Sequence, residues 1–185
     1  MKELIEKLEG LIAGWLKPLP RLPESFKKWV SVNLWWIDLI GAIVSGIALL
    51  VAIGGLITIV SMLSGIHSIF GYYYSVYSGW NVFASIVSLA FIVCTITITA
   101  IAISPLKLGK KKGWTLLFYV LLIEAVAVVV NSILTFSVLS FIFGIIFGAI
   151  GIAIGTYLLF EIRSEFGEGF SKAEIKAEEK AEEKK

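Results

Sequence analysis

Four long apolar stretches divide this chain, and the placement of the basic residues around them constrains the fold more than any other feature. The sixteen Lys and Arg residues fall before the first stretch, between the second and the third, or after the fourth. The other two connections contain neither Lys nor Arg. Because basic residues of multi-pass membrane proteins concentrate in the loops on the cytoplasmic side, this pattern predicts four membrane spans with both termini in the cytoplasm.

The composition supports a membrane location. Mean hydropathy is +0.91 and 58% of the residues are hydrophobic, which leaves too little polar surface to cover a water-soluble globule. We therefore expect an all-α membrane protein of the plasma membrane, surrounded by the lipid bilayer. Its expected parts are a four-transmembrane-helix bundle, an N-terminal amphipathic interfacial helix and a charged C-terminal tail. Nucleic acid is not an expected partner, because no basic stripe is interleaved with aromatic residues.

The expected spans lie within residues 35–163, at about 35–63, 80–103, 114–134 and 141–160. The second span should end before Ser104 and Pro105, since proline disfavours helix continuation. The short uncharged segment 135–140 should join the last two spans as an antiparallel hairpin. Segment 64–79, rich in tyrosine, should lie partly ordered at the headgroup level. Tryptophans near the span ends are predicted anchors at the membrane interface: Trp15, Trp35, Trp36, Trp80 and Trp114.

The two ends of the chain differ from the spans in composition. Residues 1–34 are predicted to form an amphipathic helix and a proline-rich linker, because apolar residues such as Leu8 and Ile12 recur at helical spacing before three prolines. This helix either lies in the membrane interface or packs on a protein, and both interpretations stay open. Residues 164–185 are mostly Glu, Lys, Ala and Gly. They predict a solvated cytoplasmic tail, disordered or transiently helical, with a docking site for a partner as the alternative.

Small residues recur at three- and four-residue intervals along the first and the fourth spans. Such stripes let membrane helices approach each other closely. They predict packing within the bundle or between subunits, and so leave open a homo-oligomer or a complex with another membrane protein. The stripes consist of Gly41, Ser45, Ala48, Ala52 and Gly55, and of Gly144, Gly148, Gly151 and Gly155.

Glu124 lies about halfway along the third span. An ionised carboxylate near the bilayer centre costs on the order of 3 kcal/mol, so this residue should face the bundle and be protonated or paired. Asn131 follows two helical turns later on the same face, and Thr95 and Thr97 of the second span are expected at comparable depth. This group is a candidate intramembrane proton or cation site. The alternative is a structural acid that ties helices together through hydrogen bonds.

The remaining polar residues predict no catalytic or metal centre. With one cysteine, Cys94, and one histidine, His67, the chain has no zinc-binding spacing and no internal disulfide. No span contains a histidine that could activate a nucleophile, and no glycine-rich phosphate loop occurs. Neither enzymatic activity nor a cofactor is expected. Asp38 is expected near the inner interface, within reach of water, Lys27 or Lys28, and His67 on the outer side.

The first third of the chain resembles a group of short four-span membrane proteins. The resemblance rests on residues 19–23 (LPRLP), 26–29 (FKKW) and the opening of the first span at 35–41 (WWIDLIG). The group occurs in genomes of small-celled candidate-phylum bacteria and has no assigned activity, so the resemblance implies a prokaryotic plasma-membrane protein. The small multidrug-resistance transporters offer only an analogy, since their membrane-embedded Glu lies in the first span rather than the third.

Two hypotheses about function follow from these patterns. In the first, the chain is a non-enzymatic assembly, accessory or scaffolding membrane protein that acts through helix–helix packing. In the second, it is a small transporter or channel in which Glu124 binds a proton or cation. The stripes of small residues favour the first hypothesis and the membrane-embedded carboxylate favours the second.

Overall fold

The protein is an all-helical membrane bundle. The computed structural model describes residues 2–65, 71–135 and 137–167. In chain order the helices are α1 (Lys2–Leu16), α2 (Glu24–Gly65), α3 (Gly71–Lys107), α4 (Lys111–Leu134) and α5 (Val138–Glu161), followed by a 3-10 turn at Arg163–Glu165. Those residues contain no β-strand, and α2 to α5 are each long and apolar enough to cross a membrane. The predicted fold class is confirmed.

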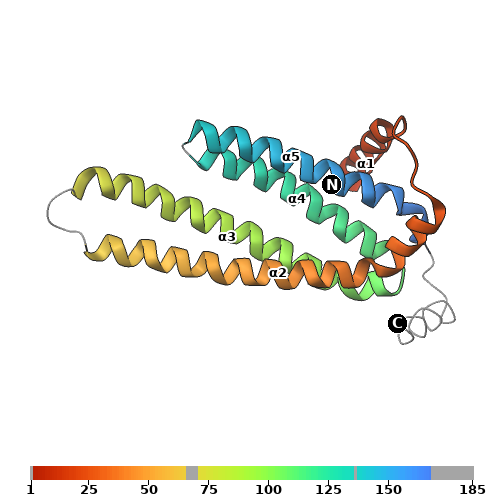
Figure 1. Ribbon diagram of the computed structural model, residues 1–185, viewed down its shortest axis with the longest axis horizontal. Helices are drawn as coiled ribbons and strands as arrows, with labels where there is room; N and C mark the ends of the chain where they lie inside the picture. Colours follow the sequence, from red (N-terminus) through yellow and green to blue (C-terminus); the bar gives the residue numbers. More distant parts are fainter. Residues whose placement is uncertain (1, 66–70, 136, 168–185) are drawn as a thin grey trace.

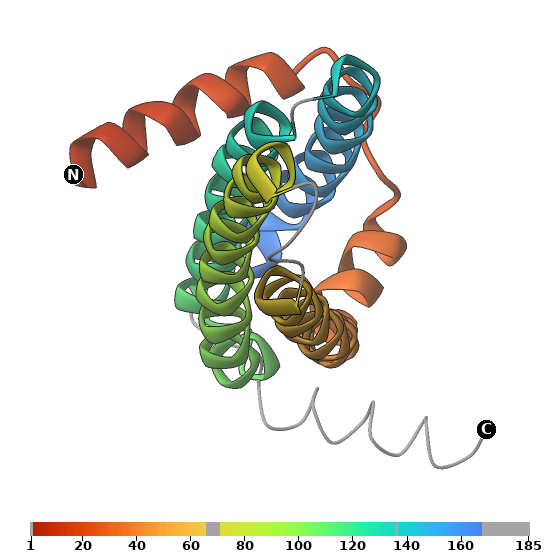
Figure 2. The same cartoon turned by 90° about the vertical axis from the view of Figure 1, so that its left-hand side faces the viewer.

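The four spans form an open row rather than a closed ring. Each span packs along its neighbour in the chain, α2 on α3, α3 on α4 and α4 on α5, whereas α2 and α5 do not pack along each other. Seen along the bundle, the helices trace an arc with α2 and α5 at its two ends (Figure 2).

The two hairpins of the bundle differ in length. Helices α2 and α3 have 42 and 37 residues, about 63 and 55 Å at 1.5 Å per residue. Helices α4 and α5 have 24 residues each, about 36 Å, which is close to the thickness of a bilayer core. The α2–α3 hairpin consequently extends beyond the α4–α5 hairpin at one end of the molecule (Figure 1).

Helical structure reaches further into this hairpin than the sequence predicts. Residues 71–79 belong to α3, so this helix begins about nine residues before the predicted span; residues 66–70, with His67, lie outside the described residues. Gly71 and Gly79 fall inside the helix, and a glycine costs a helix only about 1 kcal/mol. Packing of α3 along α2 offsets that cost.

The other end of α3 also continues past its predicted stop. Pro105 lies inside the last turn of the helix, which ends at Lys107. Leu106 anchors this turn because it is fully buried. Gly109 then reverses the chain with φ 62°, a left-handed conformation that suits glycine. At Gly113 a Cβ atom would lie 2.7 Å from the backbone nitrogen of Leu106, so only glycine permits this close approach of α3 and α4.

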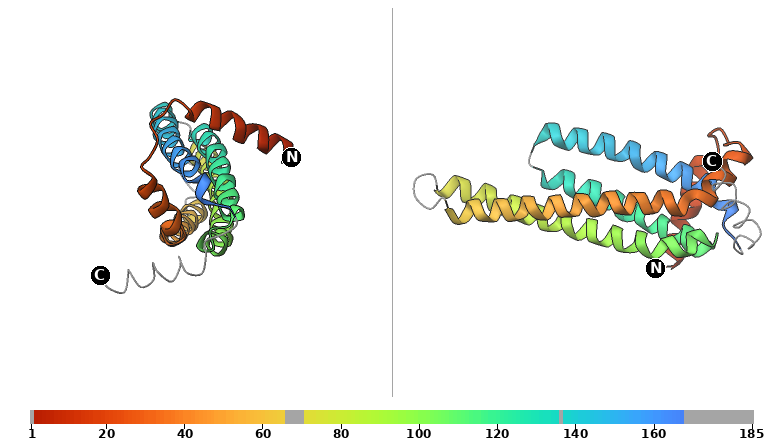
Figure 3. Two further views of the ribbon diagram at one scale, coloured as in Figure 1. Left: turned by 90° about the vertical axis from the view of Figure 1, so that its right-hand side faces the viewer. Right: turned by 60° about the horizontal axis from the view of Figure 1, so that its bottom comes forward.

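The beginning of α2 and the ends of α3 and α5 meet at one end of the molecule (Figure 3). We call it the basic end, because Arg21, Lys27, Lys107 and Arg163 lie in or next to these segments. The buried core is built there. Trp114 is only 1% exposed there, and its Nε1 donates a hydrogen bond of 2.7 Å to the carbonyl of Leu159. Carbonyls in the last turn of a helix lack intrahelical partners, so this bond satisfies a free acceptor. Trp114 is therefore a core residue and not the lipid-facing anchor that the sequence predicts. The buried hydrophobic residues of this core are Val30, Ala102, Leu106, Trp114, Phe118, Leu159, Ile162 and Phe166.

Helix α1 runs across the bundle rather than along it (Figure 2). Ile12 packs against the core, while Leu11 and Trp15 are exposed, Trp15 by 75%. The helix thus places one apolar side on the protein and leaves other apolar side chains free for lipid. Phe166, at the start of the predicted tail, is buried; residues 168–185 lie outside the described residues.

Candidate functional site

The basic end is closed by a buried ion pair between the beginning of α2 and the end of α5. Lys27 Nζ lies 3.1 Å from Glu161 Oε2, and their side chains are only 8% and 7% exposed. The same carboxylate accepts a hydrogen bond of 3.0 Å from the backbone nitrogen of Leu22 and one of 3.3 Å from Arg21 Nη1. Glu161 therefore has a partner for both oxygens, as a buried carboxylate requires.

The proline-rich linker and α1 are attached to this same end. The hydroxyl of Tyr157 donates a hydrogen bond of 2.6 Å to the carbonyl of Pro20. Arg163 pairs with Glu9 of α1 and lies over the ring of Trp114, 5.3 Å from its centroid. These contacts hold residues 17–23 and α1 against α5, so the arc of spans is closed at the basic end only.

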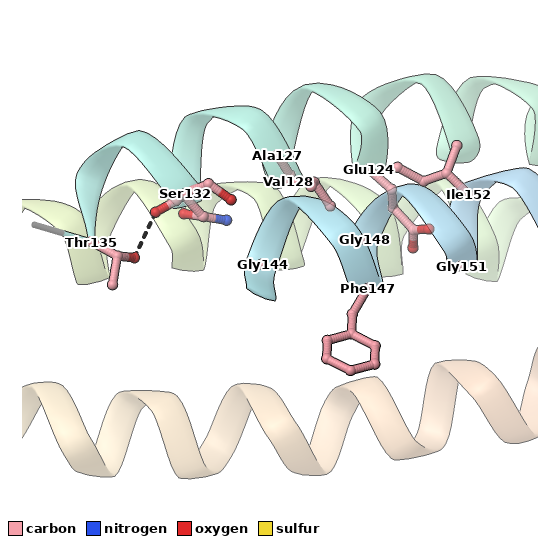
Figure 4. Close-up of a pocket in the computed structure, with 11 residues that line it drawn as sticks. Glu124, Ala127, Val128, Ser132, Thr135, Gly144, Phe147, Gly148, Gly151 and Ile152 are labelled. Carbon is pink, nitrogen blue, oxygen red and sulfur yellow. Dashed lines mark hydrogen bonds between the residues drawn. The ribbon is translucent and has the colours of Figure 1, made fainter. Parts of the chain in front are cut away.

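Further along the bundle, the arc encloses a groove with Glu124 on its wall. A pocket of about 480 Å³ lies on the α4–α5 hairpin. The carboxylate of Glu124 and the ring of Phe147 both point into the space that separates this hairpin from α2 (Figure 4). Among the described residues, Glu124 has no hydrogen-bond or ion-pair partner. The pocket is lined by Glu124, Ala127, Val128, Asn131, Ser132, Thr135, Gly144, Phe147, Gly148, Gly151 and Ile152.

A second pocket of about 430 Å³ continues the groove toward the basic end and contains Asp38. Residues of α2, α4 and α5 line it together, including Leu34, Leu121 and Gly155. Asp38 Oδ2 is buried and has no partner among the described residues. Of the contacts expected for Asp38, the one with Lys27 is not formed, because Lys27 pairs with Glu161.

The two pockets adjoin along the helices, so we treat them as one groove. On α4, Leu121 borders the pocket of Asp38 and Glu124 borders the other, one helical turn further on. On α5, Gly155 and Gly151 stand in the same relation. Asp38 is therefore about one to two turns nearer the basic end than Glu124. Two carboxyl groups without partners follow one another along a single groove.

The small-residue stripe of α2 lies on the helix face that borders the pocket of Asp38. Leu34 borders the pocket of Asp38, and Gly41, Ala48 and Gly55 follow it at seven-residue steps, which keeps them on the same face of the helix. A Cβ atom added at Gly41 or Gly55 would meet nothing within 4 Å. This face of α2 is consequently uncovered within the described chain.

The glycines of the α5 stripe face two different surfaces. At Gly148 a Cβ atom would lie 2.4 Å from Val128 Cγ1, and at Gly144 it would lie 2.9 Å from Ser132 Oγ. These glycines, with Gly155 near Leu121 at 3.1 Å, let α5 pack closely on α4. Gly151 has nothing within 4 Å and borders the groove instead.

The structure separates the residues that the sequence groups around Glu124. Asn131 lines the same pocket, and its Oδ1 accepts a hydrogen bond of 2.7 Å from Ser88 of α3. Thr95 and Thr97 instead donate to carbonyls of their own helix, at Ile92 and Val93. Neither threonine lines the pocket, because α3 packs between α2 and α4 with these hydroxyls turned to its own backbone.

The predicted anchors other than Trp114 take three different positions. Trp80 Nε1 donates a hydrogen bond of 2.8 Å to the carbonyl of Leu134, which ties α3 to the end of α4. Trp36 donates to Asn33 Oδ1 at 2.7 Å, and the ring of Trp35 lies 4.9 Å from Lys107 Nζ. Trp15 alone projects freely from the surface.

Comparisons with known proteins supply no family for this chain: no protein-family model, curated protein or solved structure matches it. The chemistry of the site therefore has to be argued from its own residues. Across the described ranges, no three His, Cys, Asp or Glu residues lie together in a way that could hold a metal ion. What the groove offers is a largely apolar wall, small residues on two helices and two unpaired carboxyl groups.

Sequence reasoning missed two of the polar features described above. The pairing of Lys27 with Glu161 and the bond from Ser88 to Asn131 each join distant parts of the chain. The available signal was the position of these polar residues within or at the ends of apolar stretches, where buried polar groups need partners.

Proposed function

We propose that the protein is a non-enzymatic membrane assembly protein, an accessory or scaffolding subunit that binds membrane helices of a partner in the groove between α2, α4 and α5. The basic end faces the cytoplasm of a plasma membrane in this proposal, since Lys and Arg mark cytoplasmic loops. Lipid contacts the exposed apolar faces of α2 to α5.

The open face of α2 and α5 carries the proposal. Helices in a bilayer gain little from burying apolar surface, so they associate through close backbone approach at small residues. Gly144 and Gly148 serve that purpose inside the protein, against α4. Gly41, Gly55 and Gly151 are equally small, but a Cβ atom at each would meet nothing within 4 Å. They therefore offer a surface on which a helix of another protein can pack closely.

Native mass spectrometry of the protein extracted gently from its own membrane tests the proposal. We expect a stoichiometric complex with a different membrane protein. Gly151→Leu should dissociate it, because a Cβ atom at this position meets nothing within 4 Å and the leucine side chain then extends into the pocket that Gly151 lines. Gly54→Leu is the matched control, because a Cβ atom at Gly54 also meets nothing within 4 Å. Gly54 points about 100° away from its neighbour Gly55, so it lies off the face of the small-residue stripe. A monomer alone, or a complex that survives Gly151→Leu, would contradict the proposal.

A small transporter or channel is the second candidate, and the unpaired carboxylate of Glu124 in a pocket of about 480 Å³ favours it. In that function Glu124 binds a proton or cation during transport. Flux of protons or monovalent cations into vesicles containing the purified protein is the measurement. Glu124→Gln should then abolish flux while the protein stays folded, whereas an absence of flux in the wild-type protein would remove this candidate.

A further inference from the structure

We infer that the groove receives one membrane-spanning helix of another protein, and that this helix carries a Lys or Arg within its span to pair with Glu124 or Asp38. The inference rests on the proposed function and names the chemistry of the partner. Three features support it: the two unpaired carboxyl groups, the lack of basic residues in the apolar segments, and the arrangement of the spans in an arc.

Among the described residues, no cation pairs with these two carboxyl groups. Asp38 Oδ2 is buried without a partner, and Glu124 has none among the described residues. The sequence contains no Lys, Arg or His between Trp29 and Ser61, between Gly79 and Leu106, or between Trp114 and Ile162. A carboxyl group in a bilayer is costly unless it is paired or protonated, and an opposite charge from a partner removes that cost.

The contrast with Glu161 strengthens this argument. That carboxylate lies in the same bundle and is paired with Lys27 at 3.1 Å, with Arg21 and with a backbone nitrogen. The protein thus satisfies an acidic group where the group serves its own fold. Asp38 and Glu124, which line the groove, have no such partner in the described part of the chain.

A second copy of this chain does not fit the groove as well as a foreign helix. Within its apolar segments 35–63, 80–103, 114–134 and 141–160 it carries the same two acids and no basic residue, so an identical subunit would bring like chemistry to Asp38 and Glu124. Charge complementarity therefore favours a different protein.

The positions of the acids predict the depth of the base. Glu124 lies near the middle of α4, which spans Lys111–Leu134. Asp38 lies at the level of Leu117 and Leu121, one to two turns nearer the basic end. A base at the centre of the partner's span should consequently depend on Glu124, and a base about two turns from the centre should depend on Asp38.

Binding of synthetic helices to the full-length protein in lipid nanodiscs tests this inference. The probes are fluorescent Leu/Ala peptides of about 20 residues, long enough to span a bilayer, with one Lys at the centre, one Lys two turns from the centre, or Gln at either place. Energy transfer to a dye on the protein measures the affinity. We expect each Lys peptide to bind about tenfold more tightly than its Gln counterpart, because an intramembrane polar contact is worth roughly that factor.

The variants assign each preference to one carboxyl group. Glu124→Gln should abolish the preference for the central Lys and leave the other intact, and Asp38→Asn should do the reverse. Gly151→Leu should weaken all peptides, and Gly54→Leu none. Glu124→Gln and Asp38→Asn keep the size of the side chain, and a Cβ atom at Gly151 or Gly54 meets nothing within 4 Å. Helical circular dichroism should therefore remain that of the wild type.

Three results would overturn the inference, and they also separate it from the proposed function. Equal binding of Lys and Gln peptides would remove the charge pairing while leaving helix docking in place. Stronger self-association than peptide binding would make a second copy the occupant. Failure of every peptide to bind, together with proton or cation flux that Glu124→Gln abolishes, would make the carboxylate an ion site. The proposed function itself fails if the native complex is absent or survives Gly151→Leu.

Discussion

The basic end of the bundle and the groove are built from the same helices, but acidic side chains are paired at the basic end and unpaired in the groove. At the basic end, Glu161 is surrounded by Lys27, Arg21 and a backbone nitrogen, and Trp114 finds the carbonyl of Leu159. In the groove, Asp38 and Glu124 have no partner among the described residues. The acidic and indole groups of the first region thus have partners within the protein, whereas the acids of the second have none among the described residues.

This difference indicates where the stability of the protein resides. The buried hydrophobic residues cluster at the basic end, so packing, ion pairing and chain attachment act together there. The groove contributes unfilled space instead, and unfilled space or an unpaired acid is a cost to the isolated protein. We therefore expect stability to depend on the basic end and binding to depend on the groove.

The largest effect is expected from breaking the ion pair at the basic end. Glu161→Gln leaves Lys27 buried without its counter-charge, and removal of one partner of a buried pair typically costs about 3–5 kcal/mol. The free energy of unfolding, measured by titrating detergent micelles with SDS, should fall by that amount. Glu24→Gln is the control, because the Glu24 side chain is 89% exposed and lies 3.8 Å from Lys27. Equal losses in the two variants would show that burial of the pair is irrelevant.

The second effect compares two glycines of one helix turn. Gly148→Leu should lower the free energy of unfolding by about 1–3 kcal/mol, the usual cost of overpacking, since its Cβ would lie 2.4 Å from Val128. Gly151→Leu should leave it nearly unchanged, because nothing lies within 4 Å. The same SDS titration measures both. If Gly151→Leu proved as harmful as Gly148→Leu, α5 would have to be covered on its groove side.

The third effect has the opposite sign. Asp38→Leu should raise the free energy of unfolding of the isolated protein by about 1–2 kcal/mol, because it removes a buried polar atom that has no hydrogen bond. Thermal unfolding in detergent is the measurement, with Asp38→Asn as the polar control that keeps the unsatisfied group. Destabilisation by Asp38→Leu would mean that this carboxyl group serves the fold, and the comparison between the two regions would fail.

The sequence predicts the membrane spans well because hydropathy is a local property. The predicted ends of helix α3 are too short for one reason: local sequence does not show the packing of the neighbouring helix. Pro105 sits in a turn held by buried Leu106, and residues 71–79 stay helical beside α2. In both places tertiary packing outweighs a local cost of one proline or two glycines.

The site was predicted less completely, because its properties depend on how the helices are arranged. Glu124 was found from its place in an apolar span, and Gly148 and Gly151 from their spacing. No spacing rule distinguishes the glycine that packs on Val128 from the one that faces open space. That distinction depends on whether the four helices close into a ring or stop as an arc, which neither hydropathy nor charge determines.

The smallest effect concerns the contact that joins the groove wall to α3. Ser88→Ala removes the hydrogen bond to Asn131 Oδ1, and such interhelical bonds in membranes average about 0.6 kcal/mol. Thr97→Val is the control, since Thr97 is exposed and bonds only the carbonyl of Val93 in its own helix. A loss near 0.6 kcal/mol in the SDS titration for Ser88→Ala, and none for Thr97→Val, would place Asn131 with the structural residues of the bundle. A loss confined to partner binding would instead place it with Glu124, as a residue of the groove.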